Sequence, residues 1–108
     1  MKLNQIKIKL KTISTKLLLG KDLIQEEETF IFDCLRIENS NIQMIALQLI
    51  IENNEATTKI FIDQFDALPP SIRNYSIPLL SSSNYEDAYI FLFSRLIFSV
   101  NENKSGIE

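Results

Sequence analysis

Apolar residues recur along this chain at the three- and four-residue spacing of an amphipathic helix. In the middle of the chain one helical face is apolar, with Thr58, Phe61, Ile62, Phe65 and Leu68. The opposite face is charged, with Lys59, Asp63 and Asp66. The same periodicity predicts helices over residues 2–19, 22–37, 41–52, 55–68, 70–80 and 85–100.

The chain also repeats itself at an interval of thirty residues. Residues 29–32 (Thr-Phe-Ile-Phe), 59–62 (Lys-Ile-Phe-Ile) and 89–92 (Tyr-Ile-Phe-Leu) align without gaps. Residues 41–50 align on 71–80, with apolar positions 42, 47, 49 and 50 matching 72, 77, 79 and 80. Further back, Leu47 and Leu49 fall on Leu17 and Leu19. Such a repeat predicts stacked units, each made of a longer and a shorter helix.

Polar and proline residues mark the expected ends of these helices. Ser40 with Gln43 has the spacing of a capping box, and proline at 69–70 suits the first turn of the next short helix. Residues 53–54 and 81–84 are predicted turns, and Pro78 is expected to kink or end its helix. The alternative is an α+β fold, because residues 29–37 and 89–100 are rich in β-branched and aromatic residues.

The shorter helix carries a recognisable pattern. It opens with Ile42-Gln43 followed by small Ala46, and its copy opens with Ile72-Arg73 followed by small Ser76. This pattern resembles the second helix of HEAT-type repeats, over roughly residues 22–100. The resemblance implies a curved stack of helix pairs that grips partners and seldom catalyses. We therefore expect one all-α domain over residues 1–108, an irregular helix-pair stack of about six helices with a polar tail at 101–108.

Composition excludes several kinds of chemistry. The 108 residues are 45% hydrophobic and 23% charged, which suits one globular domain. There is no His, so a His-based triad or a His-ligated zinc site is excluded, and Cys34 has no imidazole to activate it. One Cys and two Gly exclude an internal disulfide and a glycine-rich phosphate loop. We expect no catalytic residue, cofactor or metal site.

No stretch of the sequence resembles a membrane span or an export signal. The longest uninterrupted apolar run has six residues, 88–93, and lysines interrupt the N-terminal segment. The expected location is therefore the cytoplasm, without contact with a membrane.

Charge is segregated along the chain. Residues 1–21 hold six Lys and no acid, whereas residues 22–108 hold five basic and fourteen acidic residues, so +6 and −9 give the net −3. One interpretation is a solvated basic helix that docks on the next helix through Leu3, Ile6, Leu10, Ile13 and Leu17. The alternatives are nucleic-acid binding, which the acidic remainder disfavours, and a self-complementary contact with the acidic portion.

The acidic residues fall into two groups. Residues 26–28, Glu55, Glu86 and Asp87 precede or open helices, where carboxylates suit the helix dipole. Asp33, Asp63 and Asp66 are not explained in this way. Asp33 and Asp63 are thirty residues apart, so stacking would align them in a column that fits a cationic groove built for phosphates.

The last predicted helix is almost wholly apolar. Ile90, Phe91, Leu92 and Phe98 are expected to point inward, which leaves Tyr89, Phe93, Leu96 and Val100 on other faces. A terminal repeat is normally capped by polar residues. Either the N-terminal helix or a loop covers this surface, or the helix forms a homodimer or partner interface. The predicted partner-binding residues are Asp33, Asp63, Asp66, Glu55, Glu86, Asp87, Tyr89 and Phe93.

A small, acidic, helical protein without catalytic residues is similar in style to bacterial immunity proteins, such as those of contact-dependent growth inhibition systems. That resemblance implies a cognate protein toxin, here a basic nuclease, whose active site is occluded by an acidic surface. The alternatives are a nucleic-acid-associated antitoxin or regulator that uses the N-terminal lysines, and a small helical adaptor or oligomer subunit.

Overall fold

The computed structural model describes the backbone of residues 2–107 and the side chains of residues 2–96. Over this range the chain is helical and contains no strand. The elements are α1 (Leu3–Leu18), α2 (Gln25–Cys34), α3 (Ser40–Asn53), α4 (Glu55–Asp63), η1 (Phe65–Ala67), α5 (Pro70–Ser81) and α6 (Glu86–Ile107). The all-α prediction is confirmed, and the α+β alternative is wrong, because both isoleucine-rich segments contribute to helices.

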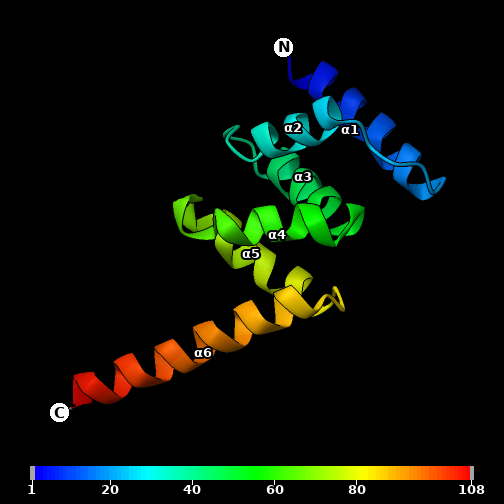
Figure 1. Ribbon diagram of the computed structural model, residues 1–108. Coiled ribbons are helices and arrows are strands. Elements are labelled where there is room, and N and C mark those ends of the chain that lie inside the picture. Colours follow the sequence, from blue (N-terminus) through cyan, green and yellow to red (C-terminus); the bar gives the residue numbers. More distant parts are fainter. Residues whose placement is uncertain (1, 108) are drawn as a thin grey trace.

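The helices form an elongated stack with α3 near its centre. Helix α3 packs on α1, α2, α4 and α5, and α6 packs on α4 and α5. Helices α1 and α2 therefore lie at one end and α6 at the other (Figure 1). The principal extents of 53 × 28 × 19 Å reflect this linear order of contacts. Each main contact joins helices that are adjacent or next but one in sequence, as expected for stacked helix pairs.

The thirty-residue repeat is visible in the burial of α3 and α5. The pairs Ile42 and Ile72, Ala46 and Ser76, and Ile50 and Leu80 are all fully buried, with 0% exposure. Two pairs differ. Leu47 is buried beside α5 whereas Ile77 is 46% exposed. Leu49 is buried whereas Leu79 is half-buried. Helix α6 also packs on α5, but no third copy of the short helix follows in the described residues to cover α5 as α5 covers α3.

The earlier extension of the repeat into α1 is wrong. Leu19 is exposed, whereas its proposed equivalent Leu49 is buried. Helix α1 buries Ile6, Leu10 and Ile13, the centre of the predicted stripe, while Leu17 is half-buried and Leu3 is exposed. This stripe packs mainly on α3 rather than on the next helix in sequence, so α1 follows its own register.

The helix lengths differ from those predicted. Helices α2 and α4 have 10 and 9 residues, and α3 and α5 have 14 and 12, so the expected longer member of each pair is the shorter one. Helix α4 ends at Asp63 and continues only as the single turn η1. Leu68 is extended because the following proline disfavours a helical conformation for it. The faces predicted for 55–68 are nevertheless correct, since Phe61, Phe65 and Leu68 are buried.

The caps use residues other than those expected. Asn39 caps α3 by accepting a hydrogen bond from the Ile42 N–H at 3.1 Å, so the capping box from Ser40 is wrong. The Gln43 amide instead donates to the carbonyl oxygens of Leu35 and Ile37 and fixes the α2–α3 turn. Gly20 closes α1 with φ +75°, and its N–H donates to the Leu17 carbonyl.

Two expected helix ends are exceeded. Helix α5 runs three residues beyond Pro78 to Ser81, so the proline precedes the helix end by one turn. Helix α6 runs to Ile107, so the backbone of the predicted polar tail is helical through that residue.

Candidate partner-binding surface

Three predicted acidic site residues lie in first turns of helices. Glu55 opens α4, and Glu86 and Asp87 open α6. Carboxylates at these positions face the positive end of the helix dipole, which stabilises the helix by roughly 0.3–1 kcal/mol each. Their placement therefore has a structural reason, as predicted, whatever partner they meet.

Glu27 has a further structural role between α1 and α2. Its carboxylate accepts hydrogen bonds from Lys16 Nζ at 2.7 Å and from the Ile24 N–H at 2.9 Å. The bond from Lys16, assisted by the backbone bond, holds the pKa of the Glu27 carboxyl below its ordinary value. Lys9 makes a second contact between these helices, with its ammonium 4.2 Å from the Phe30 ring centroid. Two of the six N-terminal lysines thus stabilise the fold.

Asp33 and Asp63 are placed differently from the first-turn acids. Asp33 is the penultimate residue of α2 and Asp63 is the last residue of α4, and both are exposed. The negative end of the helix dipole disfavours a carboxylate there. Among the described residues neither belongs to a salt bridge. They hold equivalent positions of two helices that both pack on α3, and their alignment in one column stays a prediction.

Asp66 helps to hold α6 against the stack. It forms an ion pair with Arg95, whose guanidinium also lies 5.1 Å from the Phe65 ring centroid and 5.2 Å from that of Phe91. The two rings meet edge to face at 4.8 Å. Arg95 therefore covers an aromatic contact between η1 and α6, a structural role that the sequence reading did not assign.

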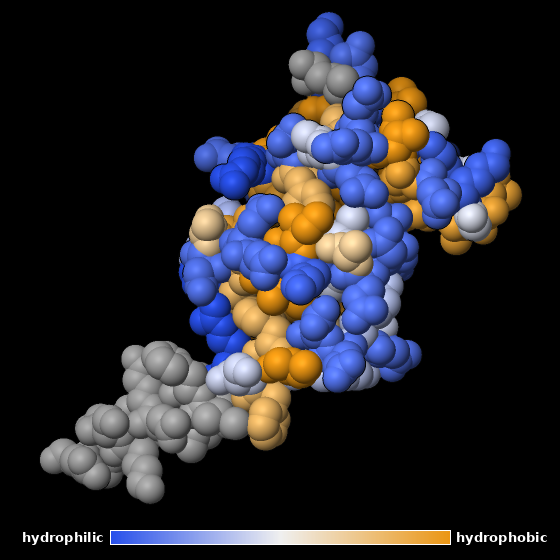
Figure 2. Space-filling model, in the orientation of Figure 1, coloured by the Kyte–Doolittle hydropathy of each residue, from blue (hydrophilic) through white to orange (hydrophobic). Residues whose placement is uncertain are grey.

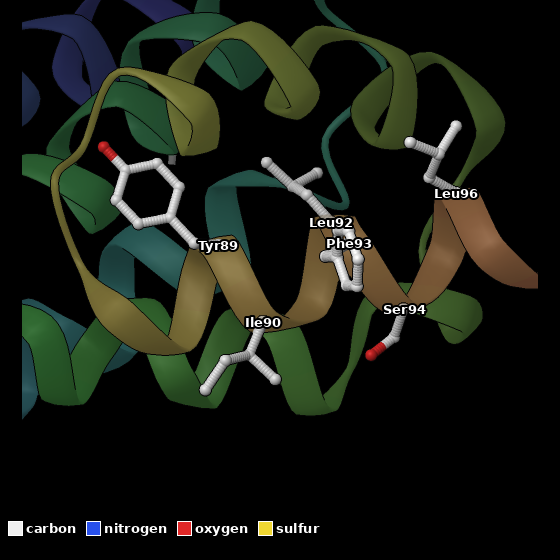
Figure 3. Close-up of a pocket in the computed structure, with 6 residues that line it drawn as sticks. All are labelled: Tyr89, Ile90, Leu92, Phe93, Ser94 and Leu96. Carbon is white, nitrogen blue, oxygen red and sulfur yellow. The ribbon is translucent and has the colours of Figure 1, made fainter.

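The outward side of α6 carries an exposed apolar strip, which we define as Tyr89, Ile90, Phe93 and Leu96. Their exposed fractions are 45%, 56%, 63% and 61%. Together with Leu92 and Ser94 they border an open hollow of about 570 Å³ (Figure 3). In that view Tyr89, Leu92 and Leu96 lie on one side of α6, and Ile90 and Ser94 lie on the other. The wider surface mixes hydrophilic and apolar side chains (Figure 2).

This strip bears on the two alternatives for the last helix: the N-terminal helix does not cover it, and the homodimer or partner interface stays a prediction. Helix α1 lies at the opposite end of the stack and does not cover it (Figure 1). Ile90 is exposed and not inward as predicted, whereas Phe91 and Leu92 are half-buried. The thirty-residue repeat contains the missed signal, because Ile90 is equivalent to exposed Ile60. Phe98 and Val100 lie outside the described side chains.

A groove between α3 and α5 was not predicted. It has a volume of about 310 Å³ and is lined mainly by apolar groups, including Met44, Tyr75 and Leu79. Its residues come from two helices that pack side by side, so it follows from the stacking and not from a sequence motif.

The described part of the chain offers few side chains suited to catalysis. Cys34 is fully buried, and burial, reinforced by the charge of Asp33, raises the pKa of its thiol to about 11. Between residues 2 and 96 no three His, Cys, Asp or Glu side chains are grouped to hold a metal ion. None of the described helices has the length and apolar character to cross a membrane.

Comparisons with protein-family models, curated proteins and solved structures find no match to this chain.

Proposed function

We propose that this chain is a non-catalytic binding protein that captures a cationic protein, in the manner of an immunity protein that occludes the active site of a nuclease toxin. The observation that carries this proposal is the placement of Asp33 and Asp63. Each carboxylate lies at the unfavourable end of its helix and has no salt bridge among the described residues. A positively charged partner would remove that cost on binding.

The remaining surface supports a partner of this chemistry. Residues 22–108 carry a net charge of −9, which steers a basic protein toward this part of the molecule. A nuclease must present positive groups to the phosphates of its substrate, so an acidic surface is complementary to its active site. The buried Cys34 and the absence of His from the whole sequence favour inhibition by occlusion over chemistry.

The binding partner in the test is a basic nuclease domain, sought first among the products of directly neighbouring genes; a neighbourhood without any toxin gene would count against the proposal. Stopped-flow association and nuclease inhibition are measured for the native chain and for Asp33→Lys/Asp63→Lys. We expect the association rate to fall about tenfold at low ionic strength, with a smaller difference at high salt.

A matched control separates local from general charge effects. Asp22→Lys/Glu38→Lys changes the net charge by the same amount at two other exposed acids, both outside the helices. This variant should associate nearly as fast as the native chain. An equal loss in both double variants would contradict the role of Asp33 and Asp63, and no inhibition by the native chain would refute the proposed function.

A further inference from the structure

The apolar strip of α6 is not required by the stacking of the helices. The thirty-residue repeat places Tyr89, Ile90, Phe93 and Leu96 on Lys59, Ile60, Asp63 and Asp66, and all eight residues are exposed. The packing face is alike in the two helices. Thr58 and Ala88 are both fully buried, and Ile62 and Leu92 are both half-buried. Helix α4 and the following turn η1 therefore show that this outward face can be charged, so the apolar residues of α6 need another explanation.

The surroundings of the strip are acidic. Glu86 and Asp87 lie in the first turn of α6, about one turn before Ile90, and belong to no salt bridge among the described residues. Arg95, the described cation in this part of α6, is already paired with Asp66. A surface that fits the strip should therefore combine apolar groups with positive charge.

The chain itself contains such a surface on α1. Opposite the buried stripe of this helix is an outer row, which we define as Ile8, Thr12, Thr15 and Leu19. Ile8 and Leu19 are each 66% exposed. The threonine hydroxyls donate to the carbonyls of Ile8 and Lys11, so their hydrogen bonds are made within the helix. Thr12, Thr15 and Leu19 also border a hollow of about 350 Å³ together with Lys16 and Lys21.

The charges of the two surfaces are complementary. Residues 1–21 carry six Lys and no acid, whereas the strip of α6 is bordered by carboxylates. Within one molecule the two surfaces cannot meet, because α1 packs on α3 at one end of the stack and α6 packs on α4 and α5 at the other (Figure 1). We propose that the strip of α6 binds the outer row of α1 from a second copy, so that copies associate head to tail.

The exposed area indicates how strong this contact is. Four side chains that are about half exposed present roughly 400 Å² of surface, about half of the roughly 800 Å² that each partner contributes to a stable interface. The association should therefore be weak, dependent on concentration, and reduced by salt. The two contacting surfaces differ, so a dimer keeps a free strip of α6 on one copy and a free outer row of α1 on the other. The assembly therefore extends beyond a dimer at high concentration.

The test is sedimentation velocity of the full chain from 10 to about 500 μM, at low and at high salt. Phe93→Asp blocks the strip by introducing the residue type found at the equivalent position of α4. Ile8→Asp blocks the outer row of α1. Ile60→Asp is the matched control, because it places the same charge on the equivalent exposed face of α4. Circular dichroism checks that all three variants keep the native helix content and melting temperature.

Mixing the two blocked variants gives the sharpest result. The native chain and Ile60→Asp should associate with rising concentration, and Phe93→Asp and Ile8→Asp should each stay monomeric. An equimolar mixture of the latter two should form dimers and nothing larger, because one intact strip meets one intact outer row. A symmetric contact between two α6 helices would instead leave Ile8→Asp associating normally, and that result would overturn the proposal.

Other outcomes are equally decisive. A native chain that stays monomeric at 500 μM and low salt, or an Ile60→Asp variant that associates no better than Phe93→Asp, would also refute head-to-tail association. This inference does not depend on the proposed capture of a cationic protein. Asp33→Lys/Asp63→Lys should bind the protein partner more slowly but associate with itself as the native chain does, so the two proposals fail separately.

Discussion

Replacing Arg95 with alanine should loosen α6 more than replacing Asp66, although the two residues form one ion pair. The Arg95 and Asp66 side chains are 42% and 74% exposed, and a surface pair of this kind contributes about 0.5 kcal/mol. Arg95 additionally faces two phenylalanine rings, and each cation–π contact adds roughly 0.5 kcal/mol at a partly exposed site. We expect Arg95→Ala to lower the free energy of unfolding by about 1.5 kcal/mol and Asp66→Ala by about 0.5 kcal/mol.

Urea denaturation followed by circular dichroism measures both values, and urea leaves the ionic strength free to vary. In 1 M NaCl the effect of Asp66→Ala should largely disappear, whereas most of the effect of Arg95→Ala should persist. Arg95→Lys keeps the positive charge but loses the planar group that faces Phe65 and Phe91, so it should fall between the two alanine variants. If both alanine variants cost the same free energy and both effects vanish in salt, the aromatic contacts do not hold α6.

Three further predictions concern other parts of the fold. Gly20→Ala should lower the free energy of unfolding by roughly 1 kcal/mol in urea titrations, because φ is +75° at this position, and Gly20→Asn should cost less. Glu27→Gln should destabilise the chain at pH 7. The folded-state pKa of Glu27 lies below its ordinary 4.5, so the stabilisation that its carboxylate contributes is present above pH 4.5 and is lost as the pH falls through the folded-state pKa. Thermal melts from pH 7 to pH 3 check this, with Glu26→Gln as control, and should show the difference between native chain and Glu27→Gln closing at acid pH. Cys34 should react with a thiol reagent at pH 8 only as fast as the chain opens, because its thiol is buried and its pKa is raised to about 11, and in 6 M guanidinium chloride it should react at once.

The sequence predicts the helices well because burial in this fold follows helical periodicity. The spacing of Phe61, Phe65 and Leu68 correctly identifies the buried face of the middle unit. Boundaries depend on competing local interactions, which periodicity does not contain. The fourth helix ends at Asp63 because the chain must reach an extended Leu68 before the prolines, although apolar spacing continues to that residue.

The candidate partner-binding surface could be predicted only in part. Tyr89 and Phe93 were assigned to it because the last helix has more apolar residues than one face can bury. Ile90 was missed because single-helix periodicity does not show which side a neighbour covers, and Arg95 was missed because its rings come from residues 65 and 91. Tertiary packing decides whether each of these residues is buried. In the sequence, the residue thirty positions earlier gives the nearest guide, as Ile60 does for Ile90.

One register position links the acidic and the apolar parts of the surface. Asp33, Asp63 and Phe93 are spaced by thirty residues and are all exposed on equivalent faces of α2, α4 and α6. If this face served only to keep the protein in solution, the third copy would have no reason to exchange a carboxylate for a phenyl ring. If it served one uniform partner, the first two copies would not carry carboxylates at unfavourable helix ends. The change from acid to aromatic along one repeated position therefore favours two contacts of different chemistry, a cationic protein on α2 and α4 and a second copy of the chain on α6.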